Sequence, residues 1–247
     1  MRFLLALPLA AVVATASLPA MAGSGDRICD YQLRYDIDMD SQGLSLTQAD
    51  EPSVRIEQGR LWIDGQRESL SASEQKRLRQ YERDMRRFSR DTVDVAVQGM
   101  QLGLQGAATA IAALTGEPLD AQTRQRMRTL ELQFKNGLDA QHLSAEHLST
   151  HFDDEIDEAV DELTGDLMEQ AIGGAGKLMA LALFAPSRLE ARADRVEQMV
   201  KTQIEGPASQ LERQADGLCQ QLQTLDMLEN SIGRFDAFER KDQGPSI

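Results

Sequence analysis

Two cysteines, Cys29 and Cys219, stand near opposite ends of this 247-residue chain. In an oxidising compartment, two cysteines without a third are expected to form a disulfide bond. Such a bond would tie the first residues of the fold to its last helical segment, and it would close a loop of nearly the whole chain. Free or intermolecular thiols are the alternative, so the compartment in which the protein works decides between the two.

The N-terminal segment 1–22 predicts that compartment. Arg2 is followed by an uncharged apolar run and then by Ala20-Met21-Ala22, the A-x-A pattern of a signal-peptidase site. The run is shorter than the roughly 20 residues of a membrane-spanning helix. A lipoprotein would need a cysteine directly after the cleavage site, where this chain has none. We expect cleavage after Ala22, a periplasmic location in a Gram-negative bacterium, no stable membrane anchor and the intramolecular Cys29–Cys219 bond.

Charge and composition limit the partners. The formal net charge is -14, and loss of the leader removes Arg2 and no acid, which makes it -15. A chain this acidic is repelled by nucleic acid, so we expect no nucleic-acid partner. Aromatic residues make up only 4% of the chain, and Ala, Leu, Gln, Glu and Arg are abundant. This balance favours helices over a sandwich or a barrel.

Residues 23–70 have the sequence pattern of β-strands. Apolar side chains from Tyr31 to Ile37 alternate with polar ones, which is typical of a half-buried strand. Further short alternating runs are separated by turns that contain glycine, a hairpin signal. The glycines of these turns are Gly43, Gly59 and Gly65. The pattern predicts an antiparallel meander of three to five strands.

Helical composition and period begin at about residue 72 and continue to about residue 232. Ser71 and Glu74 fit a capping box at the start of the first helix. One apolar stripe follows at spacings of three and four residues, which places it on one helical face. The stripe consists of Leu78, Tyr81, Met85 and Phe88. Breaks are expected around Pro118 and at Gly137.

The expected fold class is therefore α+β. A small N-terminal antiparallel β-meander (residues 23–70) is followed by a larger all-helical region (residues 71–239), and the two form one domain. We expect the polar tail 240–247 to be frayed. Residues 95–116 carry no charge. We predict that this segment forms a buried hairpin with the apolar segment 171–184, and contact with lipid or an unfolded client is the alternative.

Three segments carry a resemblance to a known family. They are C-D-Y-Q-L-R-Y-D-I-D at 29–38, G-R-L-W-I-D-G-Q at 59–66 and S-L-S-A-S-E-Q-K-R-L-R-Q-Y at 69–81. In this order, and with the late Cys219, the chain resembles the YggN-like family of exported Gram-negative proteins, a domain of unknown function. The resemblance implies a periplasmic location and the same two-cysteine arrangement. It implies no reaction.

The His142–His151 segment contains a candidate site for metal chemistry. His147 and His151 lie four residues apart, and Glu155 continues the same helical face, so these three side chains are a candidate zinc-type site. The spacing differs from the H-E-x-x-H pattern of zinc proteases, and a polar helix start accounts for the same residues. No motif for nucleophilic catalysis or nucleotide binding occurs. We expect no cofactor and lean against an enzyme.

Two helical segments of opposite charge form a candidate interaction surface. Arg79, Arg83 and Arg87 belong to a basic segment, and Asp157 and Asp161 to an acidic one. Each segment also has an apolar stripe, so the two helices can pack stripe against stripe, within one chain or across a dimer. Two separately solvated faces are the alternative. Each exposed ion pair would contribute only ~0–1 kcal/mol, so the charges would set register more than stability.

These features predict a non-catalytic interaction protein, chaperone-like or envelope-associated. Its partner would be a second copy of the chain or another envelope protein. The first alternative is a carrier of lipid or of a small hydrophobic ligand, with a pocket lined by residues 95–114 and 171–184. The second alternative is a metalloprotein or enzyme centred on the His142–His151 segment.

Overall fold

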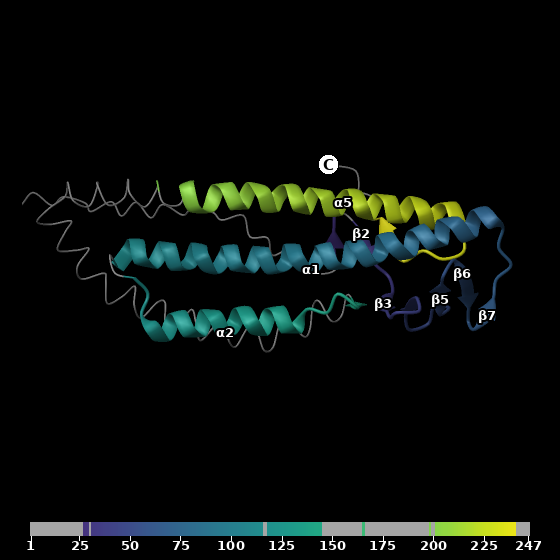
Figure 1. The fold of residues 1–247 in the computed structure, drawn as a ribbon, viewed down its shortest axis with the longest axis horizontal. Coiled ribbons are helices and arrows are strands. Elements are labelled where there is room, and N and C mark those ends of the chain that lie inside the picture. Colours follow the sequence, from purple (N-terminus) through teal and green to yellow (C-terminus); the bar gives the residue numbers. More distant parts are fainter. Residues whose placement is uncertain are drawn as a thin grey trace, which may run out of the picture.

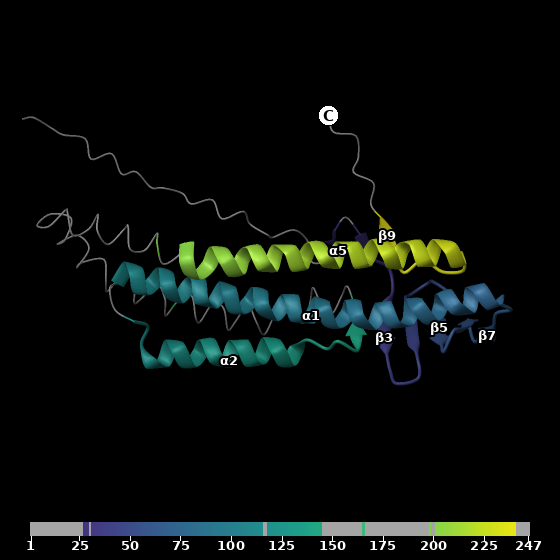
Figure 2. The same ribbon diagram turned by 45° about the horizontal axis from the view of Figure 1, so that its top comes forward.

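The computed structural model describes residues 27–29, 31–115, 118–144, 165, 198 and 201–240. The predicted signal peptide lies outside these residues. Three helices run side by side, and the strands gather at one end of them (Figure 1; Figure 2). In chain order the elements are β1 (Arg27–Ile28), β2 (Tyr31–Leu33), β3 (Asp36–Met39), β4 (Leu44–Thr47), β5 (Val54–Glu57), β6 (Arg60–Ile63), β7 (Gln66–Arg67), α1 (Ala72–Thr115), α2 (Ala121–Gly137), β8 (His142–Leu143), the π-helical segment η1 (Lys201–Glu205), α5 (Gly206–Ile232) and β9 (Phe238–Arg240).

The strands form two antiparallel sheets. The larger has the order β7-β6-β5-β4-β3-β8, and the smaller has the order β1-β2-β9. The meander β3 to β7 and the helices after it confirm the α+β prediction. Strands β8 and β9 were not predicted, and β9 lies where the sequence suggested the end of the helical region and the start of a tail. Each has only two or three residues, too few to show an alternating pattern.

The start of α1 follows the predicted capping box. The Ser71 backbone N–H donates to Glu74 Oε2 at 2.7 Å, and the Glu74 N–H donates to Ser71 Oγ at 3.3 Å. These bonds satisfy backbone donors that the first turn of a helix leaves without partners. The predicted breaks are also confirmed, because α1 ends at Thr115 and α2 at Gly137.

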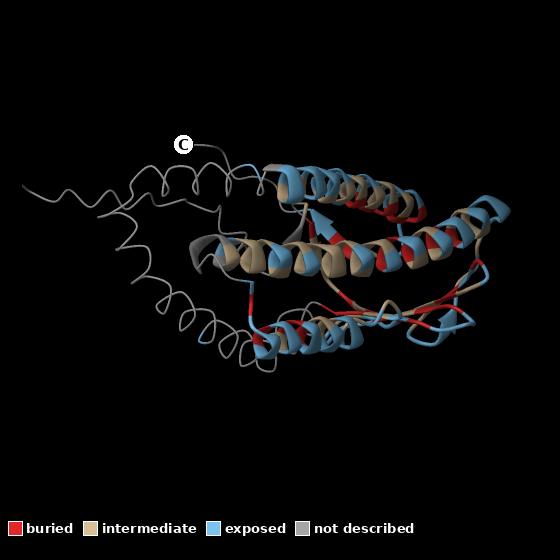
Figure 3. Ribbon diagram, turned by 60° about the vertical axis from the view of Figure 1, so that its left-hand side comes forward, coloured by how far each residue is buried: buried red, intermediate tan, exposed pale blue. Residues whose placement is uncertain are grey.

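The main core lies between the larger sheet, the first half of α1 and the second half of α5. All four residues of the predicted α1 stripe are buried there, with Tyr81 and Met85 at 0% exposure. The inward side chains of β3 to β6 meet this stripe, and Leu222 and Leu225 of α5 close the core from the other side. We name this part of the molecule the head. Most of the red residues of Figure 3 lie there, and a few others lie on α2 and just before it.

Beyond the head, α1 and α5 continue as an arm. In the described part of the chain, no residue of α1 after Ser89 is buried, and none of α5 before Leu218 is. Two glycines of α1 allow close approach: a Cβ at Gly99 would lie 3.5 Å from Leu211 Cδ2, and one at Gly106 would lie 4.0 Å from Ile204 Cδ1. The uncharged part of α1 therefore packs on α5 and η1. Its expected partner, 171–184, lies outside the described residues.

A disulfide bond joins Cys29, just after β1, to Cys219 in α5. The two Cα atoms are 5.4 Å apart, although 190 residues separate them in sequence. The bond fastens the smaller sheet to the middle of α5 and confirms the predicted pairing. None of the described helices combines the length and apolarity needed to cross a bilayer.

Loss of the disulfide bond should destabilise the head. Closing so long a loop restricts the unfolded chain, which predicts a decrease in the free energy of unfolding of about 2–5 kcal/mol for the Cys29→Ser/Cys219→Ser double variant. Urea unfolding followed by circular dichroism measures it. A reducing agent should lower the wild-type midpoint to that of the double variant and leave the double variant unchanged. An unaltered midpoint in the double variant would contradict this assignment.

Candidate functional site

A groove lies between α2 and the distal half of α1. Asp120 starts α2 as its N-cap, where Oδ1 accepts the Thr123 backbone N–H at 2.8 Å. The helix then runs back along α1 and contributes to a small second core (Figure 2). Its buried members are Leu119, Met127 and Leu130, and Met100, Leu104 and Ala108 of α1 pack against them.

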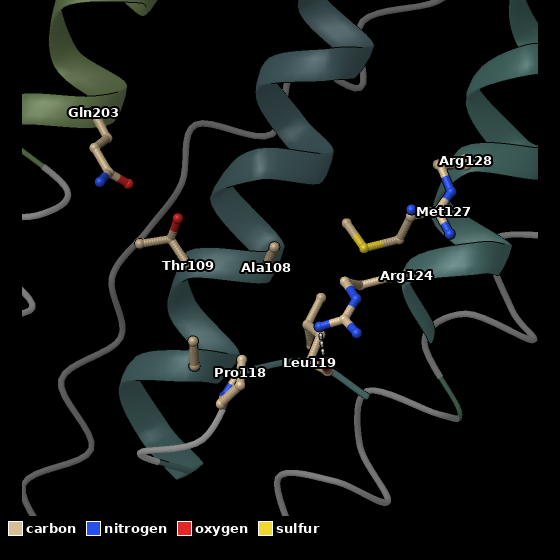
Figure 4. A pocket seen from close by; sticks show the side chains of 9 residues that line it. Ala108, Thr109, Pro118, Leu119, Arg124, Met127, Arg128 and Gln203 are labelled. Atoms are coloured by element: carbon tan, nitrogen blue, oxygen red, sulfur yellow. Dashed lines mark hydrogen bonds between the residues drawn. The ribbon is translucent and has the colours of Figure 1, made fainter. Parts of the chain in front are cut away.

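At the far end of this small core the groove opens into a hollow of about 440 Å³. Apolar and small side chains from α1, α2 and the segment between them form most of its lining, and Gln203 of η1 reaches it from the other side (Figure 4). The lining residues are Ala108, Thr109, Ala112, Pro118, Leu119, Arg124, Met127, Arg128 and Gln203. Such a volume lies within the range of about 300–1,000 Å³ that is usual for ligand sites.

Two guanidinium groups border the hollow on the α2 side. Arg124 Nη1 donates to the backbone oxygen of Leu119 at 2.7 Å, and Arg128 Nη2 donates to Gln125 Oε1 at 2.9 Å. Neither arginine forms an ion pair with a carboxylate in the described ranges. The hollow thus combines apolar walls with two guanidinium groups at one edge, and no carboxylate among the described residues pairs with either. This combination suits an apolar segment or an amphiphile with a negative head group.

The basic residues of the predicted interaction surface lie on α1. Arg79, Arg83 and Arg87 are all exposed, and their spacing of four residues places them along one helical face, away from the buried stripe. None of the three forms an ion pair with a described acid. Their predicted partners, Asp157 and Asp161, lie outside the described residues, so the pairing stays a prediction.

The predicted metal ligands His147, His151 and Glu155 also lie outside the described residues. Of the three histidines of the His142–His151 segment, only His142 is described. It is part of β8, and its Nδ1 lies 2.6 Å from Asp38 Oδ1 on the neighbouring strand. Among the described residues, no group of three or more His, Cys, Asp or Glu side chains is arranged to hold a metal ion.

The structure adds a buried carboxyl group that sequence reasoning missed. Glu229 of α5 is 1% exposed, and Tyr81 of α1 donates its hydroxyl to Glu229 Oε1 at 2.6 Å. The second oxygen, Oε2, accepts the backbone N–H groups of Ala237 at 2.8 Å and Phe238 at 3.4 Å. Glu229 therefore connects both long helices to the segment that leads into β9. A helical pattern shows a glutamate on an apolar face, but it does not show these donors.

Burial raises the pKa of Glu229 to about 8, and the nearby negative charge of Asp236 acts in the same direction. The hydrogen bonds from Tyr81 and from the two backbone N–H groups favour the ionised form and limit the rise in pKa. Burial also raises the pKa of Tyr81 well above its ordinary value, so this phenol stays protonated and continues to donate. Because Glu229 and Tyr81 are both buried, this pair is suited to stabilising the packing of α1, α5 and β9 rather than to binding a ligand.

Comparison with known families matches residues 29–234 to the family described as "Protein of unknown function (DUF2884)". This match spans the region from the first cysteine to the end of α5. No curated protein matches the sequence, and no solved structure matches it. The family description names no reaction, ligand or partner.

The buried carboxyl group predicts a pH dependence of stability. The folded-state pKa of Glu229 lies above its ordinary value of 4.5, so its stabilising contribution is complete below that value and is lost as pH rises through about 8. Between about pH 5 and pH 9 this group should lower the free energy of unfolding by a few kcal/mol, at no more than about 1.4 kcal/mol per pH unit.

Glu229→Gln isolates this contribution, because the amide stays neutral and can still pair with Tyr81 and with the Ala237 N–H. Urea unfolding at several pH values should show a flatter profile for this variant than for the wild type. Glu212→Gln, an exposed change on the same helix, should keep the wild-type slope. Equal slopes for Glu229→Gln and the wild type would rule out a raised pKa at this position.

Proposed function

The chain belongs to the DUF2884 family of proteins of unknown function, and from its geometry we propose that it is a non-catalytic, chaperone-like interaction protein. In this proposal the protein holds apolar segments of a client along its arm, in the periplasm of a Gram-negative bacterium. The leader over residues 1–22 and the likeness to the YggN-like family support export. The Cys29–Cys219 bond supports it too, because such bonds persist in oxidising compartments.

One observation carries the proposal: the distal part of α1 is uncharged and not buried. Residues 95–110 contain no Asp, Glu, Lys or Arg, and none of them is fully buried. The larger apolar side chains of this stretch are half-buried, and its fully exposed positions are Gln101, Gly103, Gln105 and Ala110. Covering apolar surface is favourable by roughly 25 cal/mol per Å², so such a face favours association. Apolar surface of this kind on a folded chain is typical of a binding site for another protein or a ligand.

The dimensions of this face suit a short stretch of unfolded chain. Sixteen helical residues, 95–110, extend over about 24 Å. An extended client segment of about seven residues would cover that length at roughly 3.3 Å per residue. The hollow beside Ala108 and Met127 would accept one large apolar side chain of such a segment. Because residues 95–110 of α1 carry no charge, binding to this stretch would depend on apolar area rather than on one client sequence.

A second candidate function is favoured by the two arginines of the hollow. Arg124 and Arg128 border an apolar space of about 440 Å³, an arrangement that fits a long-chain fatty acid or a similar anionic amphiphile. The protein would then carry a lipid-like ligand in the groove between α1 and α2. A metalloprotein centred on His147 and His151 has no supporting observation among the described residues.

The client-holding proposal predicts a loss when the hollow is filled. Ala108→Trp should weaken suppression of lactalbumin aggregation, measured by light scattering after reduction, because the indole occupies the space meant for a client side chain. The amount of protein needed for half-suppression should rise about tenfold, which corresponds to about 1.4 kcal/mol. Ala72→Trp, the same change at an exposed position at the head end of the same helix, should behave like the wild type.

Two outcomes would contradict the client-holding proposal. One is equal suppression by both tryptophan variants. The other is stoichiometric binding of palmitate without suppression of aggregation, which would support the carrier function instead. If the protein is a lipid carrier, Arg124→Gln/Arg128→Gln should weaken palmitate binding. If it holds a client, the same double variant should suppress aggregation as well as the wild type does.

The basic surface makes a separate prediction about assembly. If Arg83 and Arg87 pair with the acidic segment of the same chain or of a second copy, Arg83→Glu/Arg87→Glu should lower stability or dimerisation. Further reversal of Asp157 and Asp161 to lysine should restore it. Analytical ultracentrifugation and thermal unfolding measure both quantities. No effect of the first pair of changes would exclude the pairing and would leave the basic face solvated.

A further inference from the structure

The outer face of the larger sheet, which points away from α1, carries one row of polar and aromatic side chains. Strand pairing places six residues on a single line across the sheet, each the Cα partner of the next. They are His142, Asp38, Ser45, Arg55, Trp62 and Arg67. Cross-strand partners point to the same face, so this row faces away from the core.

A hollow of about 510 Å³ lies on this face beside Trp62. It is distinct from the groove on the arm, because strands β4 to β6 and their turns form it. The side chains that give it chemical character are three hydroxyls, one guanidinium, one carboxylate and the indole. These belong to Ser45, Thr47, Ser53, Arg55, Glu57 and Trp62. The volume again falls within the usual range of about 300–1,000 Å³ for a small-molecule site.

The indole has one side that Arg60 occupies. The Arg60 guanidinium carbon lies 5.5 Å from the ring centroid, in cation–π contact. Arg60 does not line the hollow, so the hollow reaches Trp62 from another side. Placing a half-exposed tryptophan on the wet face of a sheet contributes little to the core. It does provide a flat apolar surface next to hydrogen-bonding groups.

Arg55 is held in place by three partners. Its Nε donates to Glu57 Oε1 at 2.6 Å, its Nη1 to Ser45 Oγ at 2.6 Å and its Nη2 to Asp40 Oδ2 at 3.3 Å. Ser45 Oγ accepts in this network, so its own hydroxyl hydrogen is directed elsewhere. Arg60 Nη2 lies 4.0 Å from Glu57 Oε2, so two guanidinium groups, Arg55 and Arg60, balance the charges of the two carboxylates Glu57 and Asp40. The hollow therefore offers fixed donors and acceptors without an unpaired charge.

We propose that this hollow binds a pyranose ring of a neutral oligosaccharide. The C–H groups on one face of such a ring carry slight positive charge and pack on the negative π face of the Trp62 indole. The ring hydroxyls donate to and accept from the hydroxyls of Ser45 and Thr47, and they donate to the Glu57 carboxylate. An anionic sugar would find no free counter-charge among the residues that line the hollow, because Arg55 already has its carboxylate partners.

Trp62 provides the assay, since the chain has one tryptophan. We expect maltotriose, cellotriose or the trimer of N-acetylglucosamine to change its emission saturably, at concentrations up to about 10 mM. Calorimetry with the best of these ligands should then show at least a tenfold loss of affinity in Trp62→Ala. Thr47→Val keeps the shape of an exposed side chain but removes its hydroxyl, and it should also weaken binding. Circular dichroism verifies that each variant is folded.

Arg67→Ala is the matched control. Arg67 is the cross-strand partner of Trp62 but does not line the hollow, so a neutral ligand should bind this variant like the wild type. The proposal is overturned if none of the three oligosaccharides changes the emission, or if the affinity survives both Trp62→Ala and Thr47→Val. It is also overturned if only acidic sugars bind and Arg67→Ala abolishes their binding, because the ligand would then be anionic.

Discussion

The packing of one apolar stripe of α1 supports the rest of the structure. Leu78, Tyr81, Met85 and Phe88 are buried between the larger sheet and α5, so one helical face holds both layers of the head together. Helices owe most of their stability in proteins to such packing rather than to propensity. Once the first half of α1 is fixed, its second half extends outward as the arm, with α5 and α2 beside it (Figure 1).

Two interactions of different chemistry hold the C-terminal part of the chain to the head. The Cys29–Cys219 bond is covalent and acts mainly by restricting the unfolded chain. Glu229 acts in the folded state, where it orders the turn before β9 through Tyr81 and two backbone N–H groups. A buried carboxyl group is costly to desolvate, so its value lies in specifying one arrangement of α1, α5 and β9.

Local sequence signals predicted the parts of this fold that depend on local physics. The Ser71–Glu74 capping box, the α1 stripe and the break before Pro118 follow from propensity and period. The disulfide bond was predicted from the cysteine count and from the compartment that residues 1–22 predict. Contacts that depend on distant segments were not predictable. Strand β8 pairs with β3 across more than a hundred residues of sequence. No periodic pattern in the sequence indicates the hollow beside Ala108 or the hydrogen-bond donors around Glu229.

The two proposed binding sites depend on this fold in different ways. The Trp62 hollow lies on strands whose inner faces belong to the main core, so its hydrogen-bonding groups are held in register by the sheet. The arm surface lies beyond the last buried residue of α1, where only a small second core supports it. A rigid site is suited to a ligand of defined shape, whereas a loosely packed apolar face can adapt to varied segments. Since the sites lie at opposite ends of α1 (Figure 1), a saccharide held at the head would leave the arm free to engage a client.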